Sequence, residues 1–146
     1  MTQLKFTRRP NPVLPEHRPI YKIAQVLLIL NYSRAGKSSL LRLHLLNWAL
    51  KSPQRMQLLQ NAVRAGSLSL PTWGFDPALV IAVRYAQAEG LLTQISTGYQ
   101  LEEKGRRFIK DALKDSTILT DERVTLVEIG RGITEGMVES VAKDWD

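Results

Sequence analysis

The chain has 146 residues, 44% of them hydrophobic, which is enough for one domain with its own core. It contains no cysteine and only two histidines, His17 and His44, which excludes disulfides and a Cys/His zinc site and fits a reducing cytoplasm. The net charge is +6, and no carboxylate lies between Glu16 and Asp76, which indicates either an anionic partner or solvated helix faces. We expect no metal and no cofactor.

The first 17 residues are predicted to form an irregular basic arm, because Pro10, Pro12 and Pro15 oppose both helix and central strand. These prolines also stand where a secretion signal would be apolar. The longest apolar run, Val26–Leu30, is too short to cross a bilayer. The chain is therefore expected to be cytoplasmic, without a membrane segment.

Three helices are predicted next. The nearly continuous apolar segment Ile20–Asn31 follows Pro19, which favours a buried helix. A turn at Ser33–Gly36 leads to a second helix, Ser38–Leu50, which begins near Lys37 or Ser38. Because this helix is apolar on two faces, it is predicted to be central or to touch a partner. One of its stripes consists of Leu41, Leu45 and Trp48.

A third helix is predicted over Pro53–Ala65, followed by a short strand at Ser67–Leu70. The next helix, Asp76–Glu89, has aspartate as its N-cap, proline at its first position and glycine just after its end. Its inward residues are predicted to be apolar, while Arg84 and Gln87 point outward.

A β-hairpin is predicted from Leu91–Ile95 and Tyr99–Leu101, joined by a turn that contains Gly98, and the helix Glu102–Asp115 follows. The junction between hairpin and helix resembles that of many winged-helix proteins, and its residues are Leu101, Glu102, Glu103, Lys104, Gly105 and Arg106. We therefore predict a mainly α protein with a small β-hairpin wing (α+β), as a winged helix-turn-helix domain over residues 18–115.

Residues 116–146 are predicted to form an acidic, helical C-terminal extension. Gly130, Gly132 and Gly136 interrupt its apolar spacing, and each weakens a helix by roughly 1 kcal/mol, so this extension needs a surface on which to dock. The candidate partner-binding residues are Leu41, Leu45, Trp48, Ile133, Met137, Val141 and Trp145.

DNA contact is a second expectation. In a winged helix, Asp76–Glu89 would occupy the position of the recognition helix, yet it offers few side chains that read base edges. A protein partner is therefore at least as strong an expectation as DNA. The candidate nucleic-acid-binding residues are Arg34, Lys37, Arg42, Arg84, Gln87, Lys104, Arg106 and Arg107.

The segment Ala35–Ser39 is similar to a phosphate-binding loop, but two requirements are missing. The position five residues before Gly36, where such a loop needs glycine, is Asn31. The apolar run that starts at Val80 ends in Arg84 instead of a metal-holding aspartate. Nucleotide binding through Lys37 is thus the weakest hypothesis, and no catalytic residue is predicted.

The first half of the chain, from Arg18–Ile23 through Gly36–Leu40 to Asn47–Ser52, resembles the small middle component of prokaryotic ABC-three-component systems, the Lamassu-like anti-phage operons. The resemblance implies a non-catalytic winged-helix adaptor in a hetero-oligomer. Such an adaptor bridges an SMC-like ABC ATPase and an effector, with double-stranded DNA as an additional contact. The alternative is a stand-alone winged-helix transcriptional regulator.

Overall fold

The computed structural model describes residues 19–70, 73–115 and 117–143, and both the N-terminal arm and Trp145 lie outside them. The described part is mainly helical with one small antiparallel sheet, as the α+β prediction requires. Its elements are α1 (Pro19–Asn31), η2 (Arg34–Gly36), β1 (Lys37–Ser38), α2 (Leu40–Ala49), α3 (Pro53–Ala65), α4 (Pro77–Ala88), β2 (Leu92–Ile95), β3 (Gly98–Leu101), α5 (Glu103–Ala112), α6 (Thr120–Gly132) and α7 (Glu135–Ala142).

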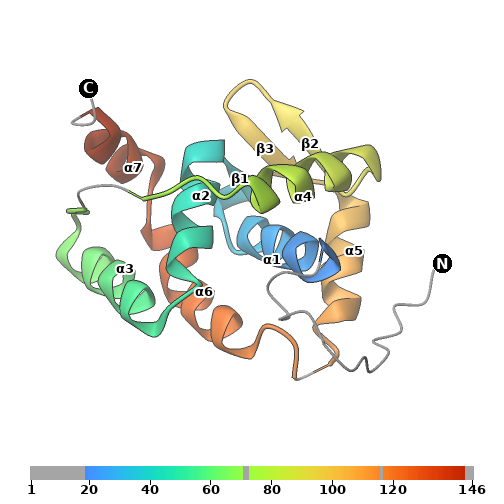
Figure 1. Ribbon diagram of the computed structural model, residues 1–146, viewed down its shortest axis with the longest axis horizontal. Helices are drawn as coiled ribbons and strands as arrows, with labels where there is room; N and C mark the ends of the chain where they lie inside the picture. Colours follow the sequence, from blue (N-terminus) through green and yellow to red (C-terminus); the bar gives the residue numbers. More distant parts are fainter. Residues whose placement is uncertain (1–18, 71–72, 116, 144–146) are drawn as a thin grey trace.

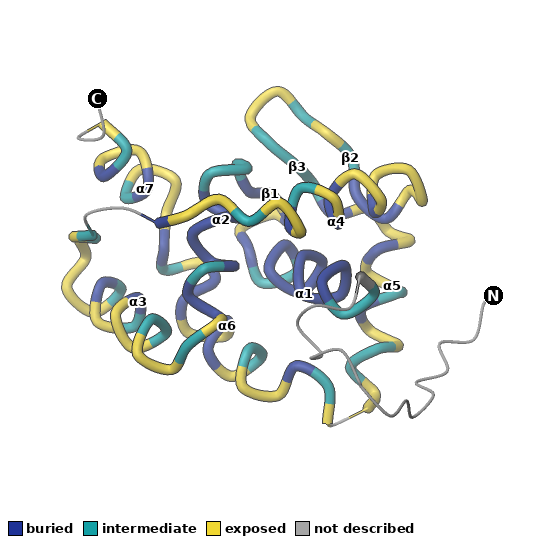
Figure 2. Tube along the Cα trace, in the orientation of Figure 1, coloured by how far each residue is buried: buried dark blue, intermediate teal, exposed yellow. Residues whose placement is uncertain are grey.

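Helix α1 lies at the centre of the molecule, with α4 and α5 on one side and α2 and α6 on the other (Figure 1). Every residue from Lys22 to Leu30 is buried. Figure 2 shows this helix in dark blue, surrounded by helices that have exposed residues on their outer sides. The predicted buried helix is confirmed. It lacks a polar face because other elements cover it on all sides.

The predicted start of the second helix is wrong by two residues. Lys37 and Ser38 form the short strand β1, which pairs with Gln100 and Tyr99 of β3. Helix α2 begins only after Ser39, whose hydroxyl accepts a hydrogen bond from the Arg42 backbone amide. A two-residue strand has no periodicity of its own, so only its partner strand reveals it.

The sheet has the order β1-β3-β2, and β2 and β3 form the predicted hairpin. Gly90, at φ +73°, lets the chain turn from α4 towards β2. Gly98, at φ +150°, lies against the backbone of Ser38, where a Cβ atom would be 2.2 Å from the carbonyl oxygen. The strand predicted at Ser67–Leu70 is wrong, because this segment is irregular and pairs with no strand.

The C-terminal helices pack onto the rest of the chain and add side chains to the same hydrophobic core as α1 and α2. Gly130 lies directly against Tyr32, and Gly132 against Val63 of α3. These two glycines therefore permit close approach between segments, at the cost of helix propensity. Among the described helices, none is long and apolar enough to span a membrane.

Candidate functional site

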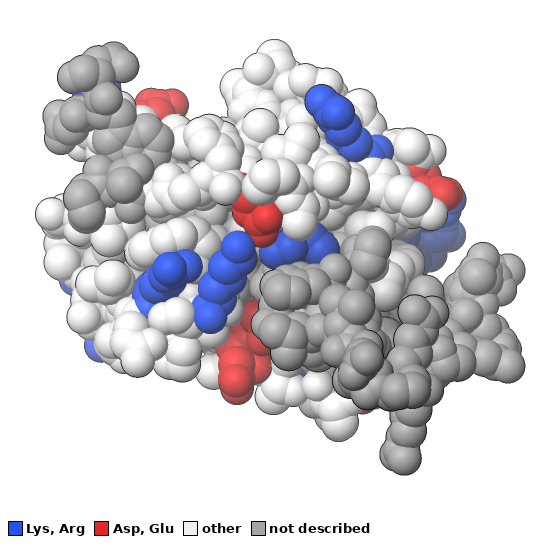
Figure 3. All heavy atoms as spheres, viewed as in Figure 1, with Lys and Arg blue, Asp and Glu red and all other residues white. Residues whose placement is uncertain are grey.

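Helix α4 is held at its N-terminus by a charged cluster. One carboxylate oxygen of Asp76 accepts from the Ala78 amide at 3.0 Å, so the residue caps the helix as predicted. The other oxygen lies 3.1 Å from the Nζ atoms of Lys22 and Lys51 and 3.1 Å from the Asn47 side-chain nitrogen. Figure 3 shows a carboxylate bordered by Lys and Arg side chains near the start of α4.

This cluster makes the Asp76 carboxylate strongly favour its ionised form. Burial alone would raise the pKa of Asp76, but the hydrogen bonds from Asn47, Lys51 and Lys22 hold that pKa far below its usual range. The Lys22 side chain is only 5% exposed and also donates to the Asn47 oxygen at 2.8 Å. The buried ammonium is therefore paired, which anchors α4 to α1 and α2.

His44 of α2 provides a second anchor just before α4. Its Nδ1 atom accepts from the Asp76 backbone amide at 3.3 Å, and its ring meets the Phe75 ring edge-on at 4.4 Å. Its Nε2 atom is buried and has no hydrogen-bond partner among the described residues. Burial lowers the pKa of His44, so the neutral ring is the favoured form. His44 is therefore a core residue, only 1% exposed.

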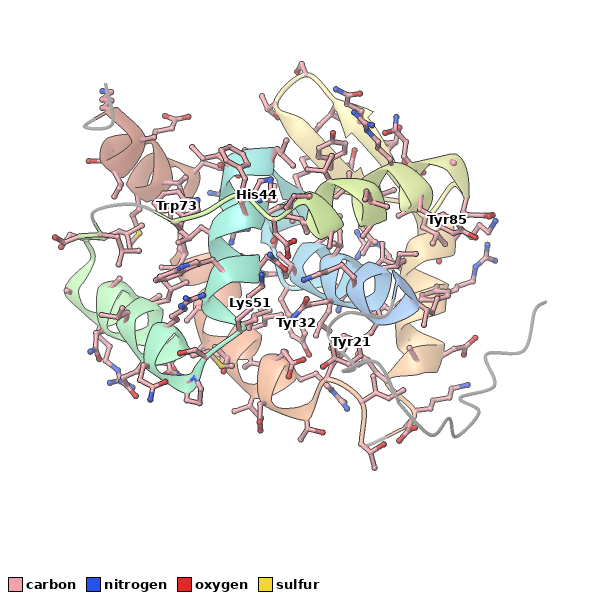
Figure 4. All side chains as sticks on the ribbon, viewed as in Figure 1. Tyr21, Tyr32, His44, Lys51, Trp73 and Tyr85 are labelled. Atoms are coloured by element: carbon pink, nitrogen blue, oxygen red, sulfur yellow. The ribbon has the colours of Figure 1, made fainter. Side chains whose placement is uncertain are left out.

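The outward face of α4 is largely apolar. Phe75, Ile81 and Tyr85 are 71%, 64% and 57% exposed, which is high for side chains of this size. Together with the exposed Ala78 and Ala88 they form what we call the α4 patch. Figure 4 labels Tyr85 near the C-terminal end of α4, and Figure 3 shows few charges over α4 and the hairpin.

Sequence reasoning missed most of the α4 patch. The sequence predicts that Leu79, Val80, Val83 and Ala86 point inward; all of these are buried except Val80, which is half-buried. However, Ala78, Ile81, Tyr85 and Ala88 recur at intervals of three and four residues and form a second apolar stripe on the same helix. That spacing was the available signal, and it marks a helix that is apolar on both faces.

A second exposed apolar spot lies on α6, where Val124 and Val127 are 69% and 68% exposed. They are three residues apart, so they neighbour each other on the helix surface. Helices α4 and α6 lie on different sides of α1 (Figure 1). The described residues thus contain two separate apolar spots.

No family model, curated protein or solved structure matches this chain.

Seven of the eight candidate nucleic-acid-binding residues are exposed; these are Arg34, Lys37, Arg84, Gln87, Lys104, Arg106 and Arg107. They come from four different elements, η2, β1, α4 and α5. Arg84 and Gln87 are on α4. The Arg106 guanidinium lies against Gly36, and Gly36 lies between Arg34 and Lys37 in the sequence. Lys104 donates to the Glu89 carbonyl at 2.7 Å, which ties α5 to the end of α4.

Arg42, the eighth candidate, is wrong as a nucleic-acid contact. Its side chain is buried, with the residue 3% exposed. The Nε atom donates to the Ile133 carbonyl at 2.7 Å, Nη1 donates to the Ser33 hydroxyl at 2.8 Å, and Nη2 donates to the Gly130 carbonyl. Burial lowers the pKa of the guanidinium, and Glu135 opposes that shift. Arg42 is therefore an internal clamp.

The predicted partner stripe on α2 is mostly internal. Leu45 is fully buried, and both Leu41 and Trp48 are half-buried against the core. The Arg55 guanidinium covers the Trp48 ring, 4.6 Å from its centroid. The helix is apolar on two faces because it is central, which was one of the two predicted explanations.

The predicted docking residues of the C-terminal segment are also internal. Ile133 and Val141 are buried, so these two are wrong as partner contacts. Met137 is half-buried against the core, and its contact with a partner stays a prediction. The surface on which this segment docks is formed by α1, α2 and α3 of the same chain. Trp145 lies outside the described residues.

The loop that resembles a phosphate-binding loop follows a helix, α1, and not the strand such a loop requires. Lys37 itself is in β1. Among the described residues, no group of three or more metal-ligating side chains comes together. A hollow of about 440 Å³ beside the Asp76 cluster is lined by charges of both signs, including Lys51, Asp121 and Glu122.

Proposed function

We propose that this chain is a non-catalytic winged-helix adaptor that holds two partner proteins together in the cytoplasm, one of them at the α4 patch. The observation that carries the proposal is the apolar, exposed outer side of α4, where Ile81 and Tyr85 are more than half exposed. Large exposed apolar side chains that recur along one helix face are typical of protein-interaction sites.

The winged-helix assignment is supported by the order of elements. A short strand, β1, lies between α1 and α2, and α4 leads directly into the β2–β3 hairpin, which would be the wing. The strand β1 completes a three-stranded sheet with that hairpin. In this assignment α3 is an insertion, and α4 is the recognition helix.

The bridging role is supported by the second apolar spot, Val124 and Val127 on α6. An adaptor needs two surfaces that two proteins can occupy at once, and α4 and α6 lie on different sides of α1 (Figure 1). With the resemblance of the first half of the sequence, the proposed partners are an SMC-like ABC ATPase and an effector of an anti-phage complex. The working assembly would then be a hetero-oligomer.

The test is co-purification of the chain with the products of the genes that flank its own. The double variant I81E/Y85E should lower the affinity for one partner by at least about tenfold, since a charge in an apolar interface costs more than about 1.4 kcal/mol. The variant V124E/V127E should release the other partner and leave the first bound. The proposal is wrong if neither gene product binds, or if both double variants bind both partners as the wild type does.

A DNA-reading regulator is the second candidate, and the observation that favours it is the exposure of Arg84 and Gln87 on α4. Both side-chain types form bidentate contacts with base edges in the major groove. This candidate predicts sequence-specific duplex binding that R84A alters, with a loss of about 1–3 kcal/mol at one base pair. Equal binding of all duplex sequences would eliminate it.

A further inference from the structure

We propose that a cationic surface made by η2, β1 and α5 binds the phosphate backbone of duplex DNA. This surface, here called the η2–α5 face, consists of Arg34, Lys37, Arg106 and Lys110, all of them exposed. It is separate from the α4 patch. The proposal therefore goes beyond the adaptor function and does not depend on it.

Three segments of the chain meet at this face. The Arg106 Nη2 atom lies 2.9 Å from the point that a Cβ atom on Gly36 would occupy. Gly36 lies between Arg34 and Lys37 in the sequence, so the guanidinium of α5 reaches the turn that carries these two cations. Arg106 and Lys110 also line a hollow of about 360 Å³ together with Asn31 from the end of α1.

The four cations are not neutralised within the described part of the chain, where none has a carboxylate oxygen within 4.0 Å. Other cations are paired: Lys22 and Lys51 with Asp76, and Lys114 with Asp111 at 3.2 Å. Three of these exposed, unpaired charges belong to the η2–β1 turn and to the arginine that reaches it, and Lys110 lies one helical turn further along α5. Together they produce a local positive potential, which attracts a polyanion.

The spacing of the charges fits a phosphate backbone. Arg106 and Lys110 are four residues apart on α5, so they lie about 6 Å apart along the helix axis, on one side of it. Both side-chain types are common phosphate ligands, arginine through its planar fork and lysine as a point charge. The face thus presents a helix row and a turn that can contact successive phosphates.

A duplex fits this face better than a single strand. Proteins that hold single strands stack the bases on exposed aromatic rings. Among the described residues, the large aromatic side chains that are mostly exposed are Phe75 and Tyr85, which belong to the α4 patch. The η2–α5 face offers charge without a stacking platform, so we infer binding to the backbone without reading of the sequence.

The experiment measures binding of the full chain to a labelled 20-base-pair duplex of mixed sequence at several salt concentrations. Four phosphate contacts give a slope of about −3.6 for log K against log salt, so affinity should fall about 150-fold between about 50 and 200 mM. The variant R34Q/K110Q removes two contacts. Its slope should be about −1.8, with a fall of only about 12-fold over the same range.

The matched control is R131Q/K143Q, which removes the same net charge from two exposed cations that also have no carboxylate oxygen within 4.0 Å in the described part of the chain. Arg131 is in the last turn of α6 and Lys143 follows α7, at the opposite end of the molecule from α5 (Figure 1), so this control should keep the wild-type slope. Thermal unfolding should show that both variants remain folded. The variant I81E/Y85E should also bind the duplex normally, which separates this proposal from the adaptor function.

Four results would overturn the proposal. The wild type could fail to bind the duplex at about 50 mM salt, where four contacts should be readily detected. The control pair could lower the slope as much as R34Q/K110Q does, which would indicate net charge alone. The matching single strand could bind as tightly as the duplex. Polyglutamate could also bind as tightly as the duplex, and in either case the face would be assigned to another polyanion.

Discussion

The Arg42 clamp offers a direct test of how the C-terminal helices are held. Gly130 and Ile133 lie at the end of α6, where backbone carbonyls have no helical partner. Arg42 of α2 donates to both of these carbonyls. In return Glu135, at the start of α7, accepts from the Ser39 amide at 2.9 Å and from its hydroxyl at 2.6 Å. Each terminus is thus capped by a charge of the favourable sign from the other segment.

The magnitude follows from what a truncation would leave behind. In R42A the carbonyls of Gly130 and Ile133 lose a charged donor inside the protein, and each unsatisfied acceptor costs about 1–3 kcal/mol. The hydroxyls of Ser33 and Ser38 both accept from Nη1 of Arg42, at 2.8 and 3.3 Å. They lose less, because they also donate to the carbonyls of Ile29 and Ser39. For the two carbonyl acceptors the expected loss of unfolding free energy is about 2–6 kcal/mol, a large share of the stability of a small domain.

Urea unfolding followed by circular dichroism measures this loss as a lower midpoint. The variant R42K keeps the charge but not the planar fork, so it should lie between wild type and R42A. The control is R64A, which breaks the exposed pair with Glu128 at 3.3 Å and should cost less than about 1 kcal/mol. An R42A loss no larger than that of R64A would refute the clamp.

Two further predictions concern single positions. The variant D76N should lower stability at pH 7 by about 2–4 kcal/mol, since buried Lys22 loses its carboxylate. Because the folded-state pKa of Asp76 is depressed, its contribution is fully present above the unfolded value of about 3.9 and is lost progressively as the pH falls from there through the folded-state pKa. The stabilities of the wild type and D76N should therefore converge as the pH is lowered through this acid range. The variant G130A should destabilise the protein by more than about 1 kcal/mol, because its Cβ atom would lie 2.5 Å from the Tyr32 carbonyl oxygen. The variant G136A should raise the thermal midpoint instead, because the nearest atom to its Cβ would be the Thr134 hydroxyl oxygen, 3.9 Å away. Equal midpoints for these two glycine variants would contradict the close-approach explanation.

Local signals in the sequence predicted most of the elements. Aspartate at the N-cap and proline at the first position predicted the start of α4 at Pro77, and the predicted bounds of the third helix, Pro53–Ala65, are those of α3. Two short strand-like segments joined by a turn that contains Gly98 predicted the hairpin. These signals work because capping and turn geometry depend on residues within a few positions of each other.

The candidate site was only partly predictable. Exposure of Arg84 and Arg106 follows from helix periodicity, but the burial of Arg42 does not, because its acceptors come from residues about ninety positions away. The proximity of Arg106 to Gly36 likewise depends on how α5 packs against α1.

The sequence by itself determined the bounds of α3, the start of α4 and the presence of the hairpin, and that α1 is too apolar to be anywhere but inside. Only the tertiary structure decided which charged and apolar side chains are buried, and which groups they contact. The tail that needed a docking surface finds it on its own chain, with Gly130 against Tyr32. Burial is a property of contacts between distant segments, so Arg42 became a clamp, and Ile81 and Tyr85 were left uncovered.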